Sequence, residues 1–408
     1  MKIGPPPQVI VVKIAADGES NLKIVWPNPF GDGKDYVYCV QIDPLLEHAH
    51  TIRKLLEKLV KSETEQGGAV TARMLFDLAQ AGYELYLGLF GATSDIGVAD
   101  EVRERLRAAT AELAARGRRY LIMFKVEDTL HIPWGLIYDS KPERVAGAPT
   151  PADYPDFWCI KYDASALNKK ITLPALQAIP DDYFRILSVV NRSALMKAAR
   201  LLPKEERLSL WDTVRWITTA FEFREPIFHK ERLFELWRSN RDKVNFLCFY
   251  GHANETMLSL GPGPEQNLPL NDFFTKLMRS EATPEKPGCV VFLNGCLTAV
   301  GRNNKGFLQA TGREGFCGFI GTETKVPDLF ALRFGIEFVT TFLNKEQRVY
   351  EIMRALREKY WPLGLSYSTC CYPLKYIENS AARRAAVSGG YAPAPPSLPR
   401  PGGPTAST

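Results

Sequence analysis

The stretch VNFLCFYGHANE, residues 244–255, is the clearest indicator of fold class in this chain of 408 residues. Its first seven residues are almost all apolar, and the run ends abruptly at Gly251 and His252. A short apolar run bounded by turn residues is typical of a strand that is buried on both faces of a parallel sheet. We therefore expect a buried strand at residues 244–250, with His252 just beyond its carboxyl end.

Strands and helices alternate on both sides of this stretch, from about residue 183 onward. Further strands are expected at residues 184–191, 288–295 and 318–325. Helices are expected in two stretches that end at residue 241, and at residues 271–280 (with Asn271 as the cap), 306–315, 328–343 and 347–359. Such alternation builds a mainly parallel sheet that is covered on both faces. The predicted fold class is therefore α/β.

The first part of the chain has a more helical pattern. A strand at residues 9–14 and a turn-rich stretch at 26–35 precede a largely helical region, 36–119, and a strand at 119–128. Apolar residues at intervals of three and four predict helices at 45–62, 71–90 and 99–117. Pro133 and Gly135 then predict a turn that Trp134 anchors.

Proline-rich stretches divide the chain into units. Pro174 and Pro180 interrupt regular structure between the two regions. The last residues are rich in Pro, Ala and Gly and are expected to be disordered, because they cannot bury enough apolar surface. The predicted units are an N-terminal segment, 1–35; a first unit, 36–178; a second unit, 183–380; and a tail, 381–408.

Composition narrows the class of protein. The net charge of +5, from 51 basic and 46 acidic residues, is too small to indicate a nucleic-acid partner or an anionic membrane. No stretch approaches the roughly 18 to 20 apolar residues of a membrane-spanning helix, and the proline-rich N-terminus is a poor signal peptide. Eight cysteines in so long a chain favour free thiols. We expect a cytoplasmic protein.

Two consecutive predicted strands end in residues that can carry out chemistry. His252 follows the first strand and Cys296 follows the second, 44 residues later, which leaves room for one crossover between adjacent parallel strands. Functional groups gather at the carboxyl ends of such strands, so we expect the imidazole to lie beside the thiol. An imidazole can hold or remove the proton of a thiol whose pKa is ordinarily near ~8.5.

The residues around this pair suit a reaction that develops an oxyanion. Gly251 and Gly295 each precede a candidate residue, where glycine allows tight backbone geometry and close substrate approach. The N–H groups of Cys296 and Ala253 are candidate donors to the oxyanion.

Other readings of the pair remain open on spacing alone. A single cysteine at a strand end often packs as a small hydrophobic residue, and a single histidine often has a structural role. Zinc is disfavoured because Cys289, Cys296, Cys317 and His252 lack the paired spacings of zinc ligands. A nucleotide- or phosphate-binding α/β protein is disfavoured because the chain has no phosphate-binding loop motif.

The sequence resembles the CHAT family of caspase-like cysteine peptidases, which are relatives of separase and the caspases. Five stretches carry this resemblance in the family's order: HIPWGLIYD, DFWCIKY, FYGHA, FLNGCLTA and FIGTETKVPDLFALRF. They extend from about residue 120 to about residue 345.

The resemblance implies a caspase-like α/β/α sandwich in which His252 is the general base and Cys296 is the nucleophile. It implies an acyl-enzyme intermediate and no metal or organic cofactor. It also implies that residues 36–178 form an inactive, caspase-like half, with the Trp134 indole packing this half against the active half at 183–380.

The sequence departs from the family pattern at three positions. Gly135 replaces the usual Glu after Trp134, Ala253 replaces the common Gly after the histidine, and Thr324 replaces a frequent aromatic residue. The methyl group of Ala253 is expected to narrow the oxyanion site, and Thr324 to reshape the specificity pocket.

Specificity is less well defined by the sequence. Asp328 either favours a basic P1 residue or caps the helix that begins beside it, whereas Lys325 favours an acidic P1 residue. The preference stays open, with a lean towards a basic P1 residue.

The partners follow from the resemblance as well. The expected substrate is a specific protein, such as a gasdermin-like pore-forming effector in bacterial defence against phages. Activation by loop rearrangement or by a protein partner is also implied, and the turn-rich stretch 261–270 is a candidate mobile element. No nucleic acid or membrane is expected as a partner. The alternative is a catalytically inert caspase-like scaffold or interaction protein.

Overall fold

The computed structural model describes residues 7–65, 68–91, 93–126, 131–168, 178–180, 185–208, 210, 227–277, 288–300, 306–307, 316–344, 347–371 and 376–378. The helix expected at 306–315 lies almost wholly outside these residues, as do the tail from 381 and most of the predicted boundary near 175–182.

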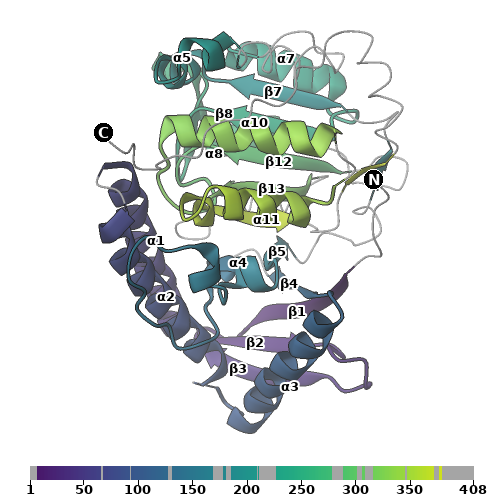
Figure 1. Cartoon of the computed structure of the whole chain (residues 1–408). Coiled ribbons are helices and arrows are strands. Elements are labelled where there is room, and N and C mark those ends of the chain that lie inside the picture. Colours follow the sequence, from purple (N-terminus) through teal and green to yellow (C-terminus); the bar gives the residue numbers. More distant parts are fainter. Residues whose placement is uncertain are drawn as a thin grey trace, which may run out of the picture.

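Two five-stranded sheets organise the described chain (Figure 1). The first sheet has the order β3-β2-β1-β4-β5, and the second has the order β14-β13-β12-β8-β7. The strands of the first sheet are β1 (Gln8–Asp17), β2 (Asn21–Trp26), β3 (Tyr36–Gln41), β4 (Tyr120–Val126) and β5 (Ser165–Asn168). The strands of the second sheet are β7 (Ile186–Val190), β8 (Phe246–Tyr250), β12 (Cys289–Asn294), β13 (Phe316–Thr322) and β14 (Tyr367–Cys371).

Both sheets are rich in parallel pairs. In the second sheet β7, β8, β12 and β13 are parallel neighbours, and only β14 runs antiparallel to its neighbour β13. In the first sheet β1, β4 and β5 are parallel, whereas β2 and β3 are antiparallel. The predicted α/β class is confirmed, and the second sheet is mainly parallel as expected.

Helices cover both faces of the second sheet. Alternate side chains of a strand point to opposite faces of the sheet. On one face, Phe292 of β12 packs against Phe338 of α10 (Asp328–Asn344), with 5.2 Å between the ring centroids. On the opposite face, Trp237 of α7 (Lys230–Asn240) stacks on Phe316. The other covering helices are α5 (Arg192–Arg200), α8 (Leu270–Lys276) and α11 (Val349–Lys359).

Three long helices pack beside the first sheet: α1 (Ile42–Glu65), α2 (Gly68–Phe90) and α3 (Ile96–Ala115). They agree with the predicted helices, but the start of the helical region was predicted too early. Residues 36–41 form β3, where buried Tyr36, Tyr38 and Val40 alternate with more exposed neighbours. That period of two is a strand pattern, and it overrides the helical reading. The predicted boundary at residue 35 falls between β2 and β3, which are paired neighbours.

The region after β8 also differs from expectation. Three short strands, β9 (His252–Asn254), β10 (Met257–Ser259) and β11 (Asn267–Pro269), form a small antiparallel sheet that was not predicted, and only β11 lies within the turn-rich stretch 261–270. Since β11 leads directly into α8, the helix begins at Leu270 and Pro269 occupies the cap position. The prediction of Asn271 as the cap was therefore wrong.

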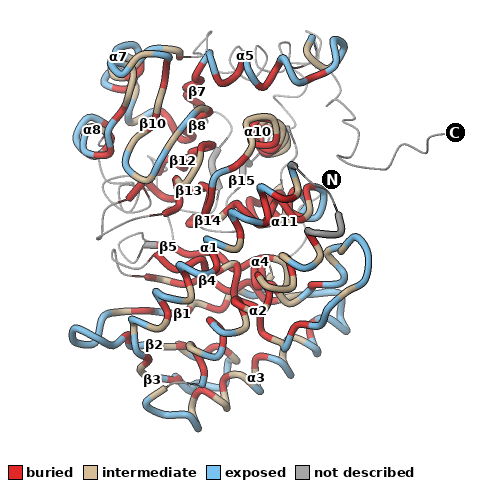
Figure 2. The backbone as a smooth tube through the Cα atoms, turned by 90° about the vertical axis from the view of Figure 1, so that its left-hand side faces the viewer, coloured by how far each residue is buried: buried red, intermediate tan, exposed pale blue. Residues whose placement is uncertain are grey.

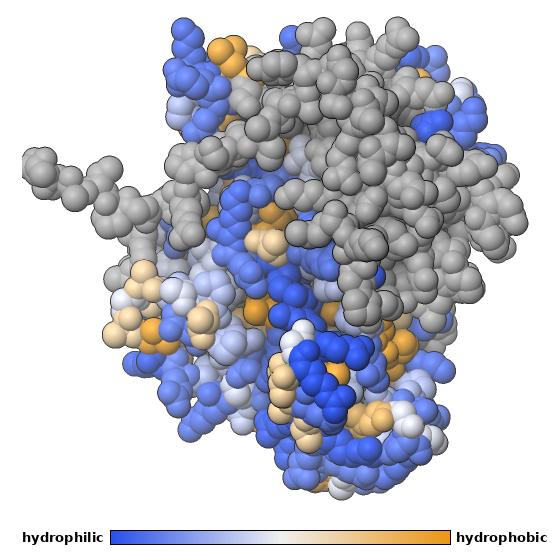
Figure 3. Space-filling view, turned by 45° about the vertical axis from the view of Figure 1, so that its right-hand side comes forward, coloured by the Kyte–Doolittle hydropathy of each residue, from blue (hydrophilic) through white to orange (hydrophobic). Residues whose placement is uncertain are grey.

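The remaining elements are short. A parallel pair joins β6 (Ala178–Pro180) to β15 (Tyr376–Glu378). The short helices are α4 (Trp158–Lys161), η1 (Trp134–Leu136), η2 (Pro151–Asp153), η5 (Pro264–Gln266) and η6 (Leu363–Ser366). Within the described part of the chain, no helix has the length and apolar character needed to cross a membrane. The face in Figure 3 is mainly hydrophilic where it is described, with separate small hydrophobic patches.

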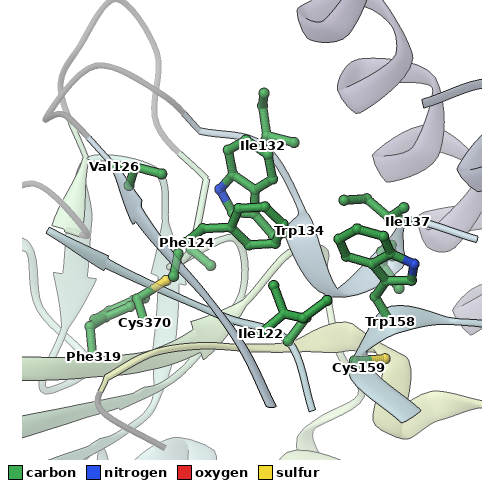
Figure 4. Packing of buried hydrophobic residues seen from close by; sticks show 14 of the residues in the cluster. Ile122, Phe124, Val126, Ile132, Trp134, Ile137, Trp158, Cys159, Phe319 and Cys370 are labelled. Atoms are coloured by element: carbon green, nitrogen blue, oxygen red, sulfur yellow. The ribbon is translucent and has the colours of Figure 1, made fainter. Parts of the chain in front are cut away.

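The two sheets meet edge to edge at β5 and β14, and buried residues continue across this boundary (Figure 2). Trp134 is 4% exposed and stacks on Phe124 with 4.3 Å between ring centroids (Figure 4). It also lines a small cavity together with Glu323, which follows β13, and Cys370 of β14, both in the second sheet's part of the chain. Trp134 therefore packs at the junction of the two sheets.

Candidate functional site

The strands β8 and β12 bring His252 and Cys296 to one edge of the second sheet. These strands are parallel neighbours, and their last paired residues are Tyr250 and Asn294. His252 and Cys296 each lie two residues beyond that pair, so they occupy equivalent positions in the register. The adjacency expected from the 44-residue spacing is therefore present in the backbone.

Two glycines let the strand ends approach each other closely. A Cβ atom on Gly295 would lie 2.7 Å from the carbonyl oxygen of Gly251 and 2.9 Å from the Cβ atom of Ala253. A Cβ atom on Gly251 would lie 2.7 Å from the Cβ atom of Asn191 and 2.9 Å from the carbonyl oxygen of Ser259. Protein atoms therefore fill the side-chain position of each glycine.

A hydrogen-bonded turn carries Cys296 after β12. The next residue, Leu297, has a φ angle of 58°, in the left-handed region that is unfavourable for a branched aliphatic residue. Its N–H group donates to the carbonyl oxygen of Thr324 at 3.2 Å. The hydroxyl of Thr298 donates to the Leu293 carbonyl at 2.9 Å, and that of Thr322 donates to the Gly295 carbonyl at 2.5 Å. These bonds hold a conformation that the local sequence does not favour.

The thiol of Cys296 is half-buried and faces the stretch that follows β13. This stretch, residues 323–327, is called the covering loop below. The Cys296 thiol donates to the carbonyl oxygen of Val326, with 3.7 Å between the sulfur and oxygen atoms. Burial raises the pKa of the Cys296 thiol, and the nearby Asp328 carboxylate acts in the same direction, while Lys325 opposes it. The thiol is therefore neutral at physiological pH in this conformation.

His252 is exposed at the start of β9 and lies near a carboxylate. Its Nδ1 atom is 3.8 Å from Oδ1 of Asp328, which is the first residue of α10. That distance is longer than a hydrogen bond, although it is close enough for a charge interaction. The imidazole side chain is 49% exposed, so its other face is open to solvent.

Asp328 is held in place from two other directions. Its Oδ2 atom lies 3.0 Å from Nζ of Lys197 on α5. Its carbonyl oxygen accepts a hydrogen bond of 3.1 Å from the Tyr250 hydroxyl at the end of β8. Sequence reasoning placed Asp328 near the pocket but missed Lys197 and Tyr250. Tyr250 could have been noticed, because it is a residue with a hydroxyl group at the end of an otherwise apolar strand.

Lys325 is engaged away from His252. Its Nζ atom lies 3.0 Å from Oε1 of Glu57 on α1, and its side chain is 65% exposed. Thr324, the other pocket candidate, is 1% exposed. The covering loop therefore contacts Cys296 on one side and α1 on the other.

Two buried asparagines that the sequence analysis did not assign a role anchor the strand ends. Asn294 donates to the Ala331 carbonyl at 2.7 Å, and it accepts a hydrogen bond of 2.5 Å from the Tyr367 hydroxyl. Asn191 donates to the Ser259 carbonyl at 2.9 Å and caps α5 by accepting from Ala194. Asn191 directly follows β7 and Asn294 is the last residue of β12, so a polar residue at the end of an apolar run was the signal for both.

The described residues contain no group of three or more His, Cys, Asp or Glu side chains arranged to hold a metal ion. A cavity of about 60 Å³ lies beneath the site, between the second sheet and α10, and is lined by Tyr250, Asn294 and mostly apolar neighbours. A second cavity of about 20 Å³ lies at the junction of the two sheets, with Ala299 of the Cys296 turn in its wall.

No model of a known protein family matches this chain, and no curated protein matches it. Among solved structures it is similar to the complex of Porphyromonas gingivalis RgpB pro- and mature domains, with a TM-score of 0.37 and 11% sequence identity. The likeness covers 79% of this chain and 76% of that chain. A likeness of this size says nothing about chemistry.

Proposed function

We propose that this protein is a caspase-like cysteine endopeptidase in which Cys296 is the nucleophile and His252 is the general base. The observation that carries the proposal is the register of β8 and β12, which end at one edge with a histidine and a cysteine at equivalent positions. The resemblance of five ordered sequence stretches to the CHAT family supports it independently. The active half would be the second sheet and its helices, with the first sheet as the inactive half.

The neutral thiol determines the order of proton transfer. Because burial raises the pKa of Cys296, His252 takes the thiol proton as the sulfur attacks the scissile carbonyl carbon. A carbon–sulfur bond forms, the carbon–nitrogen bond breaks, and the leaving amine takes the proton from His252. His252 then deprotonates a water whose oxygen attacks the thioester carbon; a carbon–oxygen bond forms, the carbon–sulfur bond breaks, the acid leaves, and the Cys296 sulfur takes the proton back from His252. No metal or organic cofactor takes part in these steps.

Backbone donors at the two strand ends complete the proposed site. The N–H groups of Cys296 and Ala253 are assigned to the developing oxyanion. The nitrogen of Ala253 lies 3.6 Å from the position that a Cβ atom on Gly295, the residue before Cys296, would take. Gly295 serves this arrangement because a side chain there would meet Gly251 and Ala253 at the other strand end.

Asp328 has two proposed roles that experiment can separate. As an orienting group, its Oδ1 faces Nδ1 of His252 at 3.8 Å and favours the imidazolium that forms during attack. As a specificity group, it would select a basic P1 residue, and Lys325 would select an acidic one. We favour orientation, because Oδ1 of Asp328 faces His252 while its Oδ2 pairs with Lys197, and Lys325 pairs with Glu57.

The finer biology is proposed on the resemblance alone. The substrate would be a specific protein, such as a gasdermin-like pore-former in defence against phages, in the cytoplasm. An activating protein partner would act on the region around residues 261–270, which adjoins β10 and β11 beside His252.

A catalytically inert scaffold is the second candidate. The specific observation in its favour is the hydrogen bond from the Cys296 thiol to the Val326 carbonyl, together with the raised thiol pKa. Both features describe a thiol that is not activated in this conformation.

Labelling with substrate-like probes separates the two candidates. The full chain is incubated with acyloxymethyl ketones that end in Arg, Lys, Asp or Leu, with Cys296→Ala as the control. Labelling of the wild type but not of Cys296→Ala supports the peptidase and identifies the P1 class. If no probe labels the wild type, even with a native partner present, the peptidase proposal is rejected in favour of the scaffold.

A further inference from the structure

Helix α1 packs beside the first sheet and contacts the covering loop through two ion pairs of different burial. Arg53 lies one helical turn before Glu57, so both side chains project from the same side of α1. Arg53 pairs with Glu323 and Glu57 pairs with Lys325, so the covering loop is attached at two points.

The Arg53–Glu323 pair is buried and extensively hydrogen-bonded. Nε of Arg53 lies 2.8 Å from Oε2 of Glu323, and the two side chains are 15% and 4% exposed. Arg53 also donates to the His131 carbonyl at 2.7 Å. The other carboxylate oxygen of Glu323 accepts a hydrogen bond from the Ser368 hydroxyl at 2.6 Å. The backbone N–H group of Glu323 donates to the Ser366 carbonyl at 2.8 Å. A buried pair with this many partners has one favourable geometry.

The covering loop transmits that geometry to the nucleophile. Thr324, directly after Glu323, accepts the hydrogen bond from Leu297 that holds the left-handed turn. Val326, three residues after Glu323, accepts the hydrogen bond from the Cys296 thiol. A shift of Glu323 therefore changes both the conformation after Cys296 and the cover over its sulfur.

We propose that Arg53, acting through Glu323, is a positioning residue that holds the covering loop against Cys296. The helix beside the first sheet thereby sets the exposure of the candidate nucleophile on the second sheet. The biological importance of this link rests on the proposed function, but the link itself does not require peptidase activity. Arg53 touches no reacting atom, so it is not assigned a catalytic role.

The second ion pair provides a matched control. Glu57 and Lys325 are 47% and 65% exposed, so solvent and salt screen their attraction. Removing the charge of Glu57 should leave the loop in place, because Arg53 and Glu323 still hold it. The two pairs join the same helix to the same loop, and they differ mainly in burial.

The test measures the reaction of iodoacetamide with Cys296 in the full chain, followed by mass spectrometry as a function of pH. In Arg53→Met the loop loosens and the thiol becomes more exposed, which lowers its pKa and makes alkylation at neutral pH about tenfold faster. Glu57→Gln should change the rate by less than about twofold. Arg53→Lys should restore part of the wild-type profile, because it keeps the charge.

A second variant guards against misfolding. Arg53→Met leaves Glu323 buried without its partner, which can unfold the chain, whereas Arg53→Met with Glu323→Gln removes both charges. A folded double variant with the fast alkylation profile supports the proposal. A folded double variant with the wild-type profile overturns it, as does equal acceleration in Glu57→Gln. Failure of acyloxymethyl ketone labelling in the wild type would reject the peptidase without affecting this result.

Discussion

A Cβ atom on Gly295 would stand 2.7 Å from the carbonyl oxygen of Gly251, so the ends of β12 and β8 approach as closely as backbones without side chains allow. This contact connects the strand that ends at His252 with the strand that ends at Cys296. The close approach of these two strand ends therefore depends on the absence of a side chain at Gly295.

Substituting Gly295 by alanine should separate the strand ends. The added methyl group meets backbone, which cannot move aside as a flexible side chain can, and overpacking of this kind costs about 1–3 kcal/mol. We expect a lower urea midpoint and slower labelling of Cys296 by a peptidyl ketone. Gly97→Ala is the control, because its Cβ atom would meet only Oδ1 of Asp95 at 3.6 Å. Equal stability of the two variants would contradict the close approach.

Asp328→Asn should lower turnover without changing the preferred P1 residue. The neutral amide no longer stabilises the imidazolium of His252, so we expect kcat to fall about tenfold or more. The measurement compares kcat/KM for Arg-ended and Leu-ended substrates in the wild type and the variant. If Asp328 instead selects a basic P1 residue, the variant loses activity towards the Arg-ended substrate alone.

His131 should make the protein less stable as the pH falls below about 6.5. Burial lowers the pKa of His131 to about 4, and the adjacent Arg53 acts in the same direction. Between these values the unfolded chain binds a proton that the folded protein does not, so stability is lost as the pH falls from about 6.5 to about 4. The maximum loss is about 3 kcal/mol.

Urea unfolding between pH 4 and pH 7.5 measures this effect. In His131→Leu the pH-dependent component from this residue should be absent, whereas His50→Leu, exposed on α1, should keep it. A wild type whose stability is flat over this range, or an unchanged slope in His131→Leu, would show that the imidazole is not buried in its neutral form.

Arg354→Met should weaken the junction between the two sheets. Arg354 on α11 donates from Nε to Oδ1 of Asp163 at 2.9 Å, and the Asp163 side chain is only 1% exposed. Removing the cation leaves a buried carboxylate whose remaining partner, Arg119, lies 3.8 Å away. We expect a loss of about 3 kcal/mol in the free energy of unfolding.

The matched control for this junction is Arg116→Met. Arg116 pairs with Glu112, and both side chains are 65% exposed. Loss of this ion pair should therefore lower the free energy of unfolding by less than about 1 kcal/mol. Thermal and urea unfolding of both variants checks the comparison. Similar losses in the two variants would show that the Arg354 pair is not desolvated.

Much of the fold could be predicted from local patterns. The long helices α1, α2 and α3 follow apolar residues at three- and four-residue intervals, and β8 and β12 follow continuous apolar runs. The strand at residues 36–41 was not predicted because it runs directly into a helix, with no turn residues between them to mark the boundary. The strands β9 to β11 were missed because strands of three residues are too short to show a period.

Some residues of the candidate site could likewise be identified from the sequence, and others could not. His252 and Cys296 were identified because each follows an apolar strand and a glycine, which are features of neighbouring residues. Asp328 was noticed for its place at a helix start, but its contact with His252 was not predicted. Arg53 carried no signal at all, since its partner Glu323 is 270 residues away in the chain.

The sequence by itself determined the alternation of strands and helices, because hydrophobic periodicity is a property of neighbouring residues. It also determined that a histidine and a cysteine end two consecutive strands. Only the tertiary structure decided which charges meet: Asp328 with His252 and Lys197, and Arg53 with Glu323. Charged side chains have many possible partners along a chain, and the packing of the strands and helices selects among them by removing some pairs from water and leaving others exposed.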